Sequence, residues 1–328
     1  MKFLIAGLGS IGRRHFRNLL ALGERDIILY RTHRATLPDD DLAGFPVETD
    51  LLAALAHRPD AVIVSNPTAL HLDVAIPAAE AGFHLFLEKP VSHVLERLDR
   101  LRNAVARTGV KVLVGFQFRF HPGLRLVHRL LNESQPAIGR AVSARAHWGE
   151  YLPNWHPWED FRQGYAARPD LGGGVVLTLC HPFDYVRWLL GDACLVSALT
   201  SSQGLGLPVE DTAEIGLRFA SGVVGSVHLD YIQRPPRHTL EIIGTEGTIR
   251  WDNADGAVQL SAAGADGNPG DWQRFPAPAD FDRNVMFLDQ MRHFRAVCRG
   301  EAEPLCSLDD GIAALELALA VHRLANAV

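Results

Sequence analysis

A glycine-rich turn follows the first apolar run of the chain and constrains the fold more than any other feature. Residues 2–6 read KFLIA, and the segment Gly7–Gly12, which has GxGxxG spacing, then enters a helical pattern over 11–22. Glycines at these positions permit a tight turn and let free N–H groups at a helix N-terminus approach a pyrophosphate. We therefore expect a dinucleotide to contact Gly7, Gly9, Ser10, Ile11 and Gly12; the alternative is a plain glycine turn.

The first third of the chain alternates short apolar runs with helical patterns. Besides 2–6, the runs occupy residues 27–31, 61–65, 83–88 and 111–115, and helical segments include 11–22 and 93–107. Nearly continuous apolar strands separated by helices are typical of a parallel sheet covered on both faces. We predict an α/β fold, a doubly wound Rossmann domain over residues 1–120.

The pattern changes after residue 120. We expect a helix at 122–131, a strand at 140–150, a helix opening at 172–174, then strands within 195–203, 211–220, 222–232, 238–252 and 257–262. Residues 263–278, rich in Gly, Pro and Asp, are expected to form a surface loop, followed by helices at 285–299 and 307–327 with Ser307 as N-cap. The prediction is an α+β domain over 121–328 with a large, mainly antiparallel sheet, which binds substrate and joins subunits. Its C-terminal helix can also pack on the first domain.

Composition excludes several classes of partner. The 328 residues carry a formal charge of −6, and no basic run is interleaved with aromatic residues, so a nucleic-acid partner is not expected. No uncharged stretch approaches the roughly 18 apolar residues that a membrane span requires. The four cysteines include no CxxC pair, which favours free thiols in a reducing, cytoplasmic compartment.

The end of the second predicted strand bears on the choice of cofactor. An acidic residue roughly 20 positions after the glycines usually binds the ribose hydroxyls of NAD, yet residues 27–38 contain no Asp or Glu. Arg31 and Arg34 could instead hold a 2′-phosphate, and Thr32 could donate a hydrogen bond to it. The sequence therefore favours NADP over NAD, with a solvated basic turn as the alternative.

Polar residues follow the third and fourth predicted strands, at the edge where an open α/β sheet places ligand-binding groups. Ser65-Asn66-Pro67-Thr68 and His71 follow the third strand, and Glu88-Lys89-Pro90 follows the fourth. With the glycine turn, the run 172–174 leading to His181 and Asp184, and the terminal segment 308–311, these motifs resemble the Gfo/Idh/MocA family of oxidoreductases. The resemblance extends over most of the chain.

The resemblance implies that Lys89 lies beside the nicotinamide and the substrate hydroxyl, and that the Lys89–Pro90 bond is cis. A lysine there could polarise the reacting oxygen; the alternative is a surface lysine in a turn. The cofactor-binding residues that we expect from this edge are Ser65, Asn66, Pro67, His71, Glu88 and Lys89.

Three polar residues recur at three-residue intervals in the segment 171–191. Thr178, His181 and Asp184 would share one face of a continuous helix and meet one substrate. His181 could transfer a proton, with Asp184 orienting it or binding a neighbouring hydroxyl. Many members of the family have an aspartate where Thr178 stands and an extra residue before the histidine, so the resemblance does not imply a strong acid–base pair at that point. A buried structural histidine is the competing interpretation.

The loop 151–162 combines indole rings with polar donors, a mixture that suits sugar rings. We expect Trp155, His156 and Trp158 to bind substrate, and an aromatic plug is the alternative. Gln117 and Arg119, after the last Rossmann strand, are also expected at the substrate. Other histidines, such as His128, His228, His238, His293 and His322, show no ligand spacing, and we predict no metal site.

These features together predict hydride transfer between a nicotinamide cofactor and a secondary alcohol of a sugar, sugar derivative or cyclitol. Two alternatives stay open: a glycoside-cleaving enzyme that recycles its dinucleotide, and a catalytically silent dinucleotide-binding sensor. Residues 222–232 carry more apolar side chains than one covered face of a sheet needs, so we expect a homo-oligomer, dimer or tetramer, through the C-terminal sheet.

Overall fold

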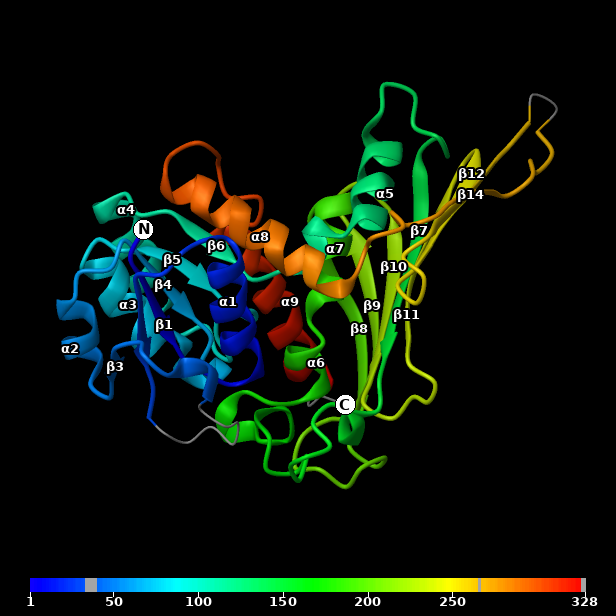
Figure 1. The fold of residues 1–328 in the computed structure, drawn as a ribbon. Coiled ribbons are helices and arrows are strands. Elements are labelled where there is room, and N and C mark those ends of the chain that lie inside the picture. The colour runs from blue at the N-terminus through cyan, green and yellow to red at the C-terminus, as the bar shows by residue number, and fades with distance from the viewer. Residues whose placement is uncertain (33–39, 265–266, 326–328) are drawn as a thin grey trace. The chain divides into compact units, whose positions relative to one another are not determined.

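The computed structural model describes residues 1–32, 40–264 and 267–325 (Figure 1). The chain divides into two compact units, each described separately below. Unit 1 comprises Met1–Gln117, Asp170–Gly172 and Arg283–Leu315, and unit 2 comprises Phe118–Pro169, Gly173–Asp282 and Glu316–Val328. Among the described residues, no helix combines the length and the apolar character needed to cross a membrane.

Unit 1 contains a six-stranded parallel sheet, which confirms the predicted doubly wound fold. The strand order is β3-β2-β1-β4-β5-β6. The strands are β1 (Phe3–Ala6), β2 (Ile27–Tyr30), β3 (Val47–Glu48), β4 (Ala61–Val64), β5 (His84–Leu87) and β6 (Val112–Val114). All residues of β1 and β4 are buried, as expected for central strands covered on both faces. The two-residue edge strand β3 was not predicted, because it is too short to leave a periodic pattern.

Helices cover this sheet. They are α1 (Ser10–Ala21), α2 (Leu51–Ala56), α3 (His71–Glu80), α4 (Leu98–Thr108) and α8 (Arg283–Cys298), with 3-10 turns η1 (Asp40–Leu42) and η2 (Thr68–Leu70). Figure 1 shows α8 beside α1, where the Arg14 guanidinium lies 4.5 Å from the ring centre of Phe287. Helix α4 begins later than predicted, because Arg97 at its N-terminus has a φ of 71° and interrupts the helical backbone.

The last helix, α9 (Leu308–Ala325), begins where the sequence predicts. Ser307 Oγ accepts a hydrogen bond from Asp310 N at 3.1 Å, and Asp310 Oδ2 accepts one from Ser307 N at 2.9 Å. This reciprocal pair is a capping box, which satisfies two backbone donors at the helix start.

Unit 2 contains an eight-stranded sheet in the order β14-β13-β12-β11-β7-β10-β9-β8, antiparallel except for the pair β7–β10. This confirms the predicted mainly antiparallel sheet. The strands are β7 (Ala141–Gly149), β8 (Ala193–Ser201), β9 (Thr212–Phe219), β10 (Val224–Asp230), β11 (Arg237–Gly244), β12 (Gly247–Asp252), β13 (Val258–Ala262) and β14 (Gln273–Phe275). Helices α5 (Pro122–Asn132) and α7 (His181–Leu190) pack on one face (Figure 1).

One prediction about unit 2 is wrong. The segment 263–278 is not only a loop, because it contains β14 and a bridge between Ala263 and Pro269. Strand β10 alternates, so that Val227 and Leu229 point into the core, whereas Val224, Ser226 and His228 face outward. Val224 is 53% exposed, so this strand presents an apolar side chain on the outer face of the sheet.

The predicted continuous helix after 172–174 is also wrong. It is two helices, α6 (Val175–Thr178) and α7, separated by Leu179 and Cys180. Pro182 explains the break, because it has no N–H to donate to the carbonyl of Thr178 four residues earlier. Proline fits the first turn of a new helix, where such a donor is not needed.

Candidate functional site

The glycine turn of unit 1 is enforced by packing at two of its three glycines. Gly7 has a φ of 94°, and a Cβ there would lie 2.4 Å from Asn66 N. A Cβ on Gly12 would lie 2.0 Å from Gly7 O. Only glycine therefore fits where the turn after β1 meets the start of α1 and the end of β4.

Gly9 differs, because the space beside it is open. A Cβ on Gly9 would meet no described atom within 4 Å, and its φ of −72° suits any residue. Gly9 is the N-cap of α1, and no side chain caps this helix start. An open, uncapped helix N-terminus is suited to binding a phosphate group, so this cradle fits the pyrophosphate of a dinucleotide.

Arg13 donates a hydrogen bond to the backbone of this turn, a contact that was not predicted. Its guanidinium is buried, with Nε donating to Leu8 O at 3.1 Å and Nη1 paired with Asp41 Oδ1 at 2.5 Å. Asp41 also pairs with Arg17 one turn further along α1. The arginine thereby fixes the backbone of the cradle.

Arg31 directly follows β2. The residue is 8% exposed, and its backbone N–H donates to Glu48 O at 3.0 Å. Thr32 is exposed. Arg34 lies outside the described residues.

The turn after β4 is bonded directly to the glycine turn. Ser65 Oγ donates to Gly7 O at 2.9 Å, and Asn66 Nδ2 donates to Leu70 O at 3.0 Å. Pro67 is the N-cap residue of η2. The structure thus brings together the predicted residues Gly7, Gly12, Ser65 and Asn66 at the carboxyl ends of β1 and β4.

His71 links the ends of β4 and β5. Its Nδ1 lies 2.8 Å from Pro90 O and its Nε2 lies 3.0 Å from Asn66 O. Burial lowers the pKa of His71 to about 4. A neutral imidazole carries one N–H, so His71 can donate to only one of these two carbonyl oxygens at a time. The ring nevertheless lies between the two backbone turns.

The predicted residues after β5 have two different environments. The Lys89–Pro90 bond is cis, as the resemblance implied, and Lys89 is half-buried. Glu88 is buried, with Oε1 2.7 Å from His15 Nε2 and Oε2 accepting from Lys89 N at 3.2 Å. His15, a completely buried residue of α1, was missed because nothing in the sequence signals a contact between residues 73 positions apart.

In unit 2 the predicted residues Arg119 and Asp184 form a buried ion pair. Arg119 Nε donates to Asp184 Oδ1 and Oδ2 at 3.1 and 3.0 Å, and Nη2 donates to Oδ1 at 2.7 Å. Both side chains are almost fully buried. Arg119 lies in η3 (Gln117–Phe120), the turn that connects the two units, in which Gln117 is also buried.

Thr178 and His181 lie on separate helices rather than on one face. Thr178 ends α6 and hydrogen-bonds to the hydroxyl of Tyr231. His181 begins α7 and is 2% exposed, with its ring centre 5.0 Å from that of Phe118 and 5.3 Å from that of Trp148. Thr178 therefore supports the packing of unit 2.

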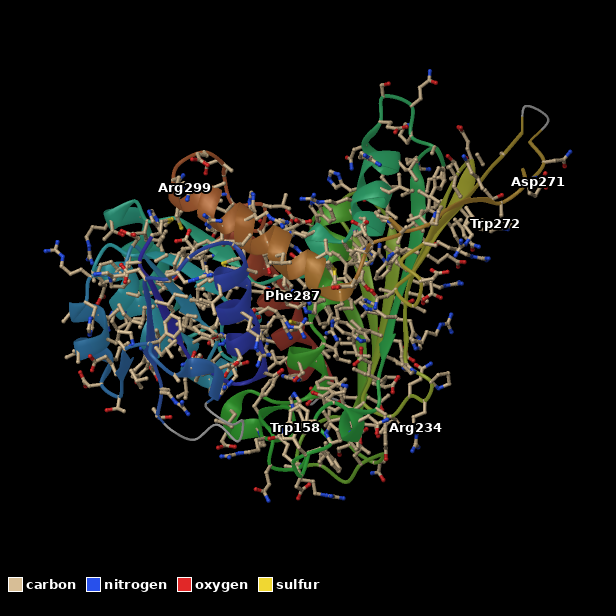
Figure 2. The ribbon with its side chains drawn as sticks, in the orientation of Figure 1. Trp158, Arg234, Asp271, Trp272, Phe287 and Arg299 are labelled. Carbon is tan, nitrogen blue, oxygen red and sulfur yellow. The ribbon has the colours of Figure 1, made fainter. Side chains whose placement is uncertain are left out.

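The two tryptophans of the loop 151–162 also lie in different environments. Trp155 packs edge-on against Tyr231, with ring centres 5.7 Å apart. Trp158 is 57% exposed and lies 5.0 Å from the ring of His156, which pairs with Glu159 at 3.0 Å. Figure 2 labels Trp158 at the edge of unit 2.

The histidines outside the predicted site are not all isolated. His128 stacks on Trp188, His238 stacks on Trp148, and His293 accepts from Leu305 N. His322 lies 3.1 Å from Glu210. His228, however, contacts both Glu214 and Asp230. The sequence signal was the spacing of His228 and Asp230, because residues two apart share a face of a strand.

Comparisons with known proteins cover most of the chain. Residues 1–116 match the oxidoreductase family with an NAD-binding Rossmann fold, and residues 124–250 match the GFO/IDH/MocA C-terminal domain. The 1,5-anhydro-D-fructose reductase of Ensifer adhaerens is 29% identical over 270 residues, 81% of this chain and 77% of that protein. The inositol 2-dehydrogenase of Rhizobium meliloti (strain 1021) is 24% identical over 339 residues, 98% of this chain and 96% of that protein.

A solved structure shares the fold. A levoglucosan dehydrogenase in complex with NADH and levoglucosan superposes with a TM-score of 0.85 at 22% identity, covering 100% of this chain and 97% of that one. With a glycine cradle in unit 1, a mainly antiparallel sheet in unit 2 and matches to both family domains, the chain belongs to the Gfo/Idh/MocA family of NAD-binding oxidoreductases.

Proposed function

We propose that this protein reversibly oxidises a secondary hydroxyl of a sugar, sugar derivative or cyclitol, with a nicotinamide dinucleotide as hydride acceptor. The observation that carries the proposal is the open, uncapped start of α1 at Gly9, which leaves room for a pyrophosphate. The names of the relatives support the substrate class, because they act on an anhydrosugar and on inositol.

Lys89 and His181 are the proposed catalytic residues. In the oxidative direction the substrate carbon loses a hydride to the nicotinamide, and the hydroxyl loses its proton. We assign to Lys89 the hydrogen bond that stabilises charge on the reacting oxygen, and to His181 the acceptance of the proton. Glu88 and His71 serve as positioning residues, because both contact protein groups that hold the turns after β4 and β5.

The proposed substrate contacts lie in the loop 151–162 and in η3. Exposed Trp158 and its neighbour His156 offer an indole face and a polar ring, which is the mixture that binds sugars. Gln117 is assigned to a substrate hydroxyl. Arg119 and Asp184 satisfy each other, so their proposed role is to fix η3 against α7.

NADP is the proposed cofactor in preference to NAD. Arg31 and Thr32 follow β2, and Arg34 follows them in the sequence, with no acidic residue between positions 27 and 38. A guanidinium is suited to a 2′-phosphate. Arg34→Ala should therefore raise the KM for NADP more than the KM for NAD. An equal rise in the KM for NAD and the KM for NADP would contradict the proposed preference for NADP.

Two finer proposals concern location and assembly. Cysteine usage favours the cytoplasm. We also propose association of identical subunits through the outer face of the eight-stranded sheet, which α5 and α7 leave uncovered. Sedimentation equilibrium should give a mass above that of one chain, and a monomer at micromolar concentration would contradict this proposal.

The reaction is tested by offering the purified protein NAD and NADP with a panel of sugars, anhydrosugars and inositols, and following absorbance of the reduced nicotinamide. We expect turnover with at least one polyol and a ketone product. A panel without any reduction of either cofactor would count against the proposal. Cleaved glycoside without net reduction would instead indicate the glycoside-cleaving alternative.

A further inference from the structure

Three metal-ligating side chains converge on the outer face of the sheet in unit 2. His147 lies on β7, and His228 and Asp230 lie on the adjacent strand β10. The parallel register places His147 opposite His228 and Gly149 opposite Asp230. The two imidazole rings stack with centres 4.4 Å apart, and one ligand atom from each of the three residues lies within 4.8 Å of the other two.

Each of the three residues is oriented by a second group. His228 Nδ1 lies 2.6 Å from Glu214 Oε1, and His147 Nε2 lies 2.6 Å from Gln233 Oε1. Asp230 Oδ1 accepts hydrogen bonds from the backbone N–H groups of residues 232 and 233 at 2.7 and 2.6 Å. Its other oxygen, Oδ2, therefore faces His228 Nε2 at 2.9 Å.

This arrangement matches the outer shell of known metal sites. A histidine that binds a metal commonly donates its second ring N–H to a carboxylate or carbonyl, which fixes the tautomer and the ring orientation. Glu214 can fill that role for His228, which leaves Nε2 as the ligand atom. Gln233 can fill it for His147, which leaves Nδ1 with the lone pair.

Gly149 provides the space for this cluster. A Cβ at Gly149 would lie 2.2 Å from both Asp230 Oδ2 and Gln233 Oε1. Any other residue at this position would displace the two oxygens. Because Gly149 has no side chain, the side chains of Asp230 and Gln233 can occupy the space beside β7.

We propose that His147, His228 and Asp230 bind a divalent transition-metal ion, with Zn²⁺ the best match. Two imidazoles and one carboxylate are a donor set that Zn²⁺ accepts, with bonds of about 2.0–2.2 Å in a tetrahedron. Ligand atoms in such a tetrahedron lie about 3.4 Å apart. The three ligand atoms here lie within 4.8 Å of one another, so the widest pair needs to close by no more than about 1.4 Å. His228 Nε2 and Asp230 Oδ2, which are 2.9 Å apart, need to separate by about 0.5 Å. The fourth position remains for water, since 24% of the His228 side chain is exposed.

An alternative assigns the cluster to ion pairing alone. A protonated His228 between the carboxylates of Glu214 and Asp230 would satisfy both without a metal. This alternative predicts no stoichiometric metal binding. The stoichiometry of metal binding therefore distinguishes the two interpretations.

The test is calorimetric titration of the chelator-treated, full-length protein with ZnCl₂. We expect one equivalent to bind. His228→Asn or Asp230→Asn should weaken that binding by more than Glu214→Gln, which replaces the orienting carboxylate with a neutral amide and should cost no more than about 10–100-fold in affinity. Asp230→Asn keeps the oxygen that accepts the backbone N–H groups, so it should preserve the turn.

Two control variants separate this site from other zinc ligands. His57→Asn removes a histidine that pairs with Glu48 in unit 1, and Cys194→Ser removes the exposed thiol on β8. Both should bind zinc as the wild type does. Binding unaffected by His228→Asn and Asp230→Asn, or absent from the wild type, would overturn the proposal.

Folding of the variants is checked by thermal unfolding without zinc. Added zinc should raise the Tm of the wild type, because a ligand that binds only the folded state stabilises it. The same addition should leave the Tm of His228→Asn unchanged, and an equal rise in both would contradict the site. If one variant fails to fold, Glu214→Gln provides an independent measurement. These readouts do not depend on the proposed oxidoreductase activity.

Discussion

Arg119 and Asp184 form a buried ion pair in unit 2, with the guanidinium Nε shared between both carboxylate oxygens and Nη2 2.7 Å from Oδ1. The pair joins η3 to α7. Because both side chains are almost fully buried, removing one charge would leave the other without its counter-ion in a poorly solvated environment.

Asp184→Asn should therefore lower the free energy of unfolding by about 3–5 kcal/mol, measured by urea denaturation. The matched control is Asp73→Asn, which breaks an ion pair between Asp73 and Arg97 whose side chains are both about half exposed. Exposed pairs typically contribute less than about 1 kcal/mol. Equal losses in the two variants would show that burial does not govern the contribution of this pair.

Stability should depend on pH through His121. Burial lowers the pKa of His121 to about 4, against an ordinary value of 6.5. As the pH falls from 6.5 toward 4, the unfolded chain gains a proton that the folded protein does not, so the free energy of unfolding decreases. The loss from one such histidine is at most about 3 kcal/mol.

His121→Asn should reduce this loss. Asparagine can still accept the hydrogen bond that His121 Nδ1 receives from Gly123 N at the start of α5, but it does not titrate. His71, with a pKa also lowered to about 4, should preserve part of the dependence. Urea unfolding curves between pH 4 and pH 6.5 measure the difference, and parallel profiles for the two proteins would contradict the account.

The proposed role of Lys89 predicts a catalytic rather than a structural loss. Lys89→Ala should lower kcat by about 10²–10⁴-fold, the range typical of a group that assists proton transfer, while dinucleotide affinity changes little. Lys111→Ala is the control, because it removes a half-exposed lysine that pairs with Glu303 in the same unit. The measurement is steady-state kinetics with a polyol that the wild type oxidises. An unchanged kcat in Lys89→Ala would show that Lys89 has no catalytic role.

Much of unit 1 could be predicted because its signals are local. The glycine turn, the buried strands and the Ser307 cap each depend on residues close together in the sequence. Strands β3 and β14 escaped prediction because two or three residues leave no periodic pattern. The break before α7 had a readable signal in Pro182, which was overlooked because the apolar periodicity continues through it.

The side-chain pairings were less predictable. The residue types at Glu88 and Asp184 were identified, but their partners His15 and Arg119 lie 73 and 65 positions away. Sequence spacing alone cannot pair such residues, because their contacts depend on which elements pack together. The cluster of His147 and His228 escaped for the same reason, since only strand register brings β7 and β10 side by side.

The central claim is that a dinucleotide phosphate occupies the open space beside Gly9. Binding of NAD and NADP to the wild type, to Gly9→Ala and to Gly164→Ala, measured by calorimetry, tests it most directly. Gly164 is the control, because its Cβ would make ordinary contact at 3.4 Å. Gly9→Ala should keep the wild-type stability and lose about tenfold or more in dinucleotide affinity, at least about 1.4 kcal/mol. Undiminished affinity for both dinucleotides in Gly9→Ala would contradict the account.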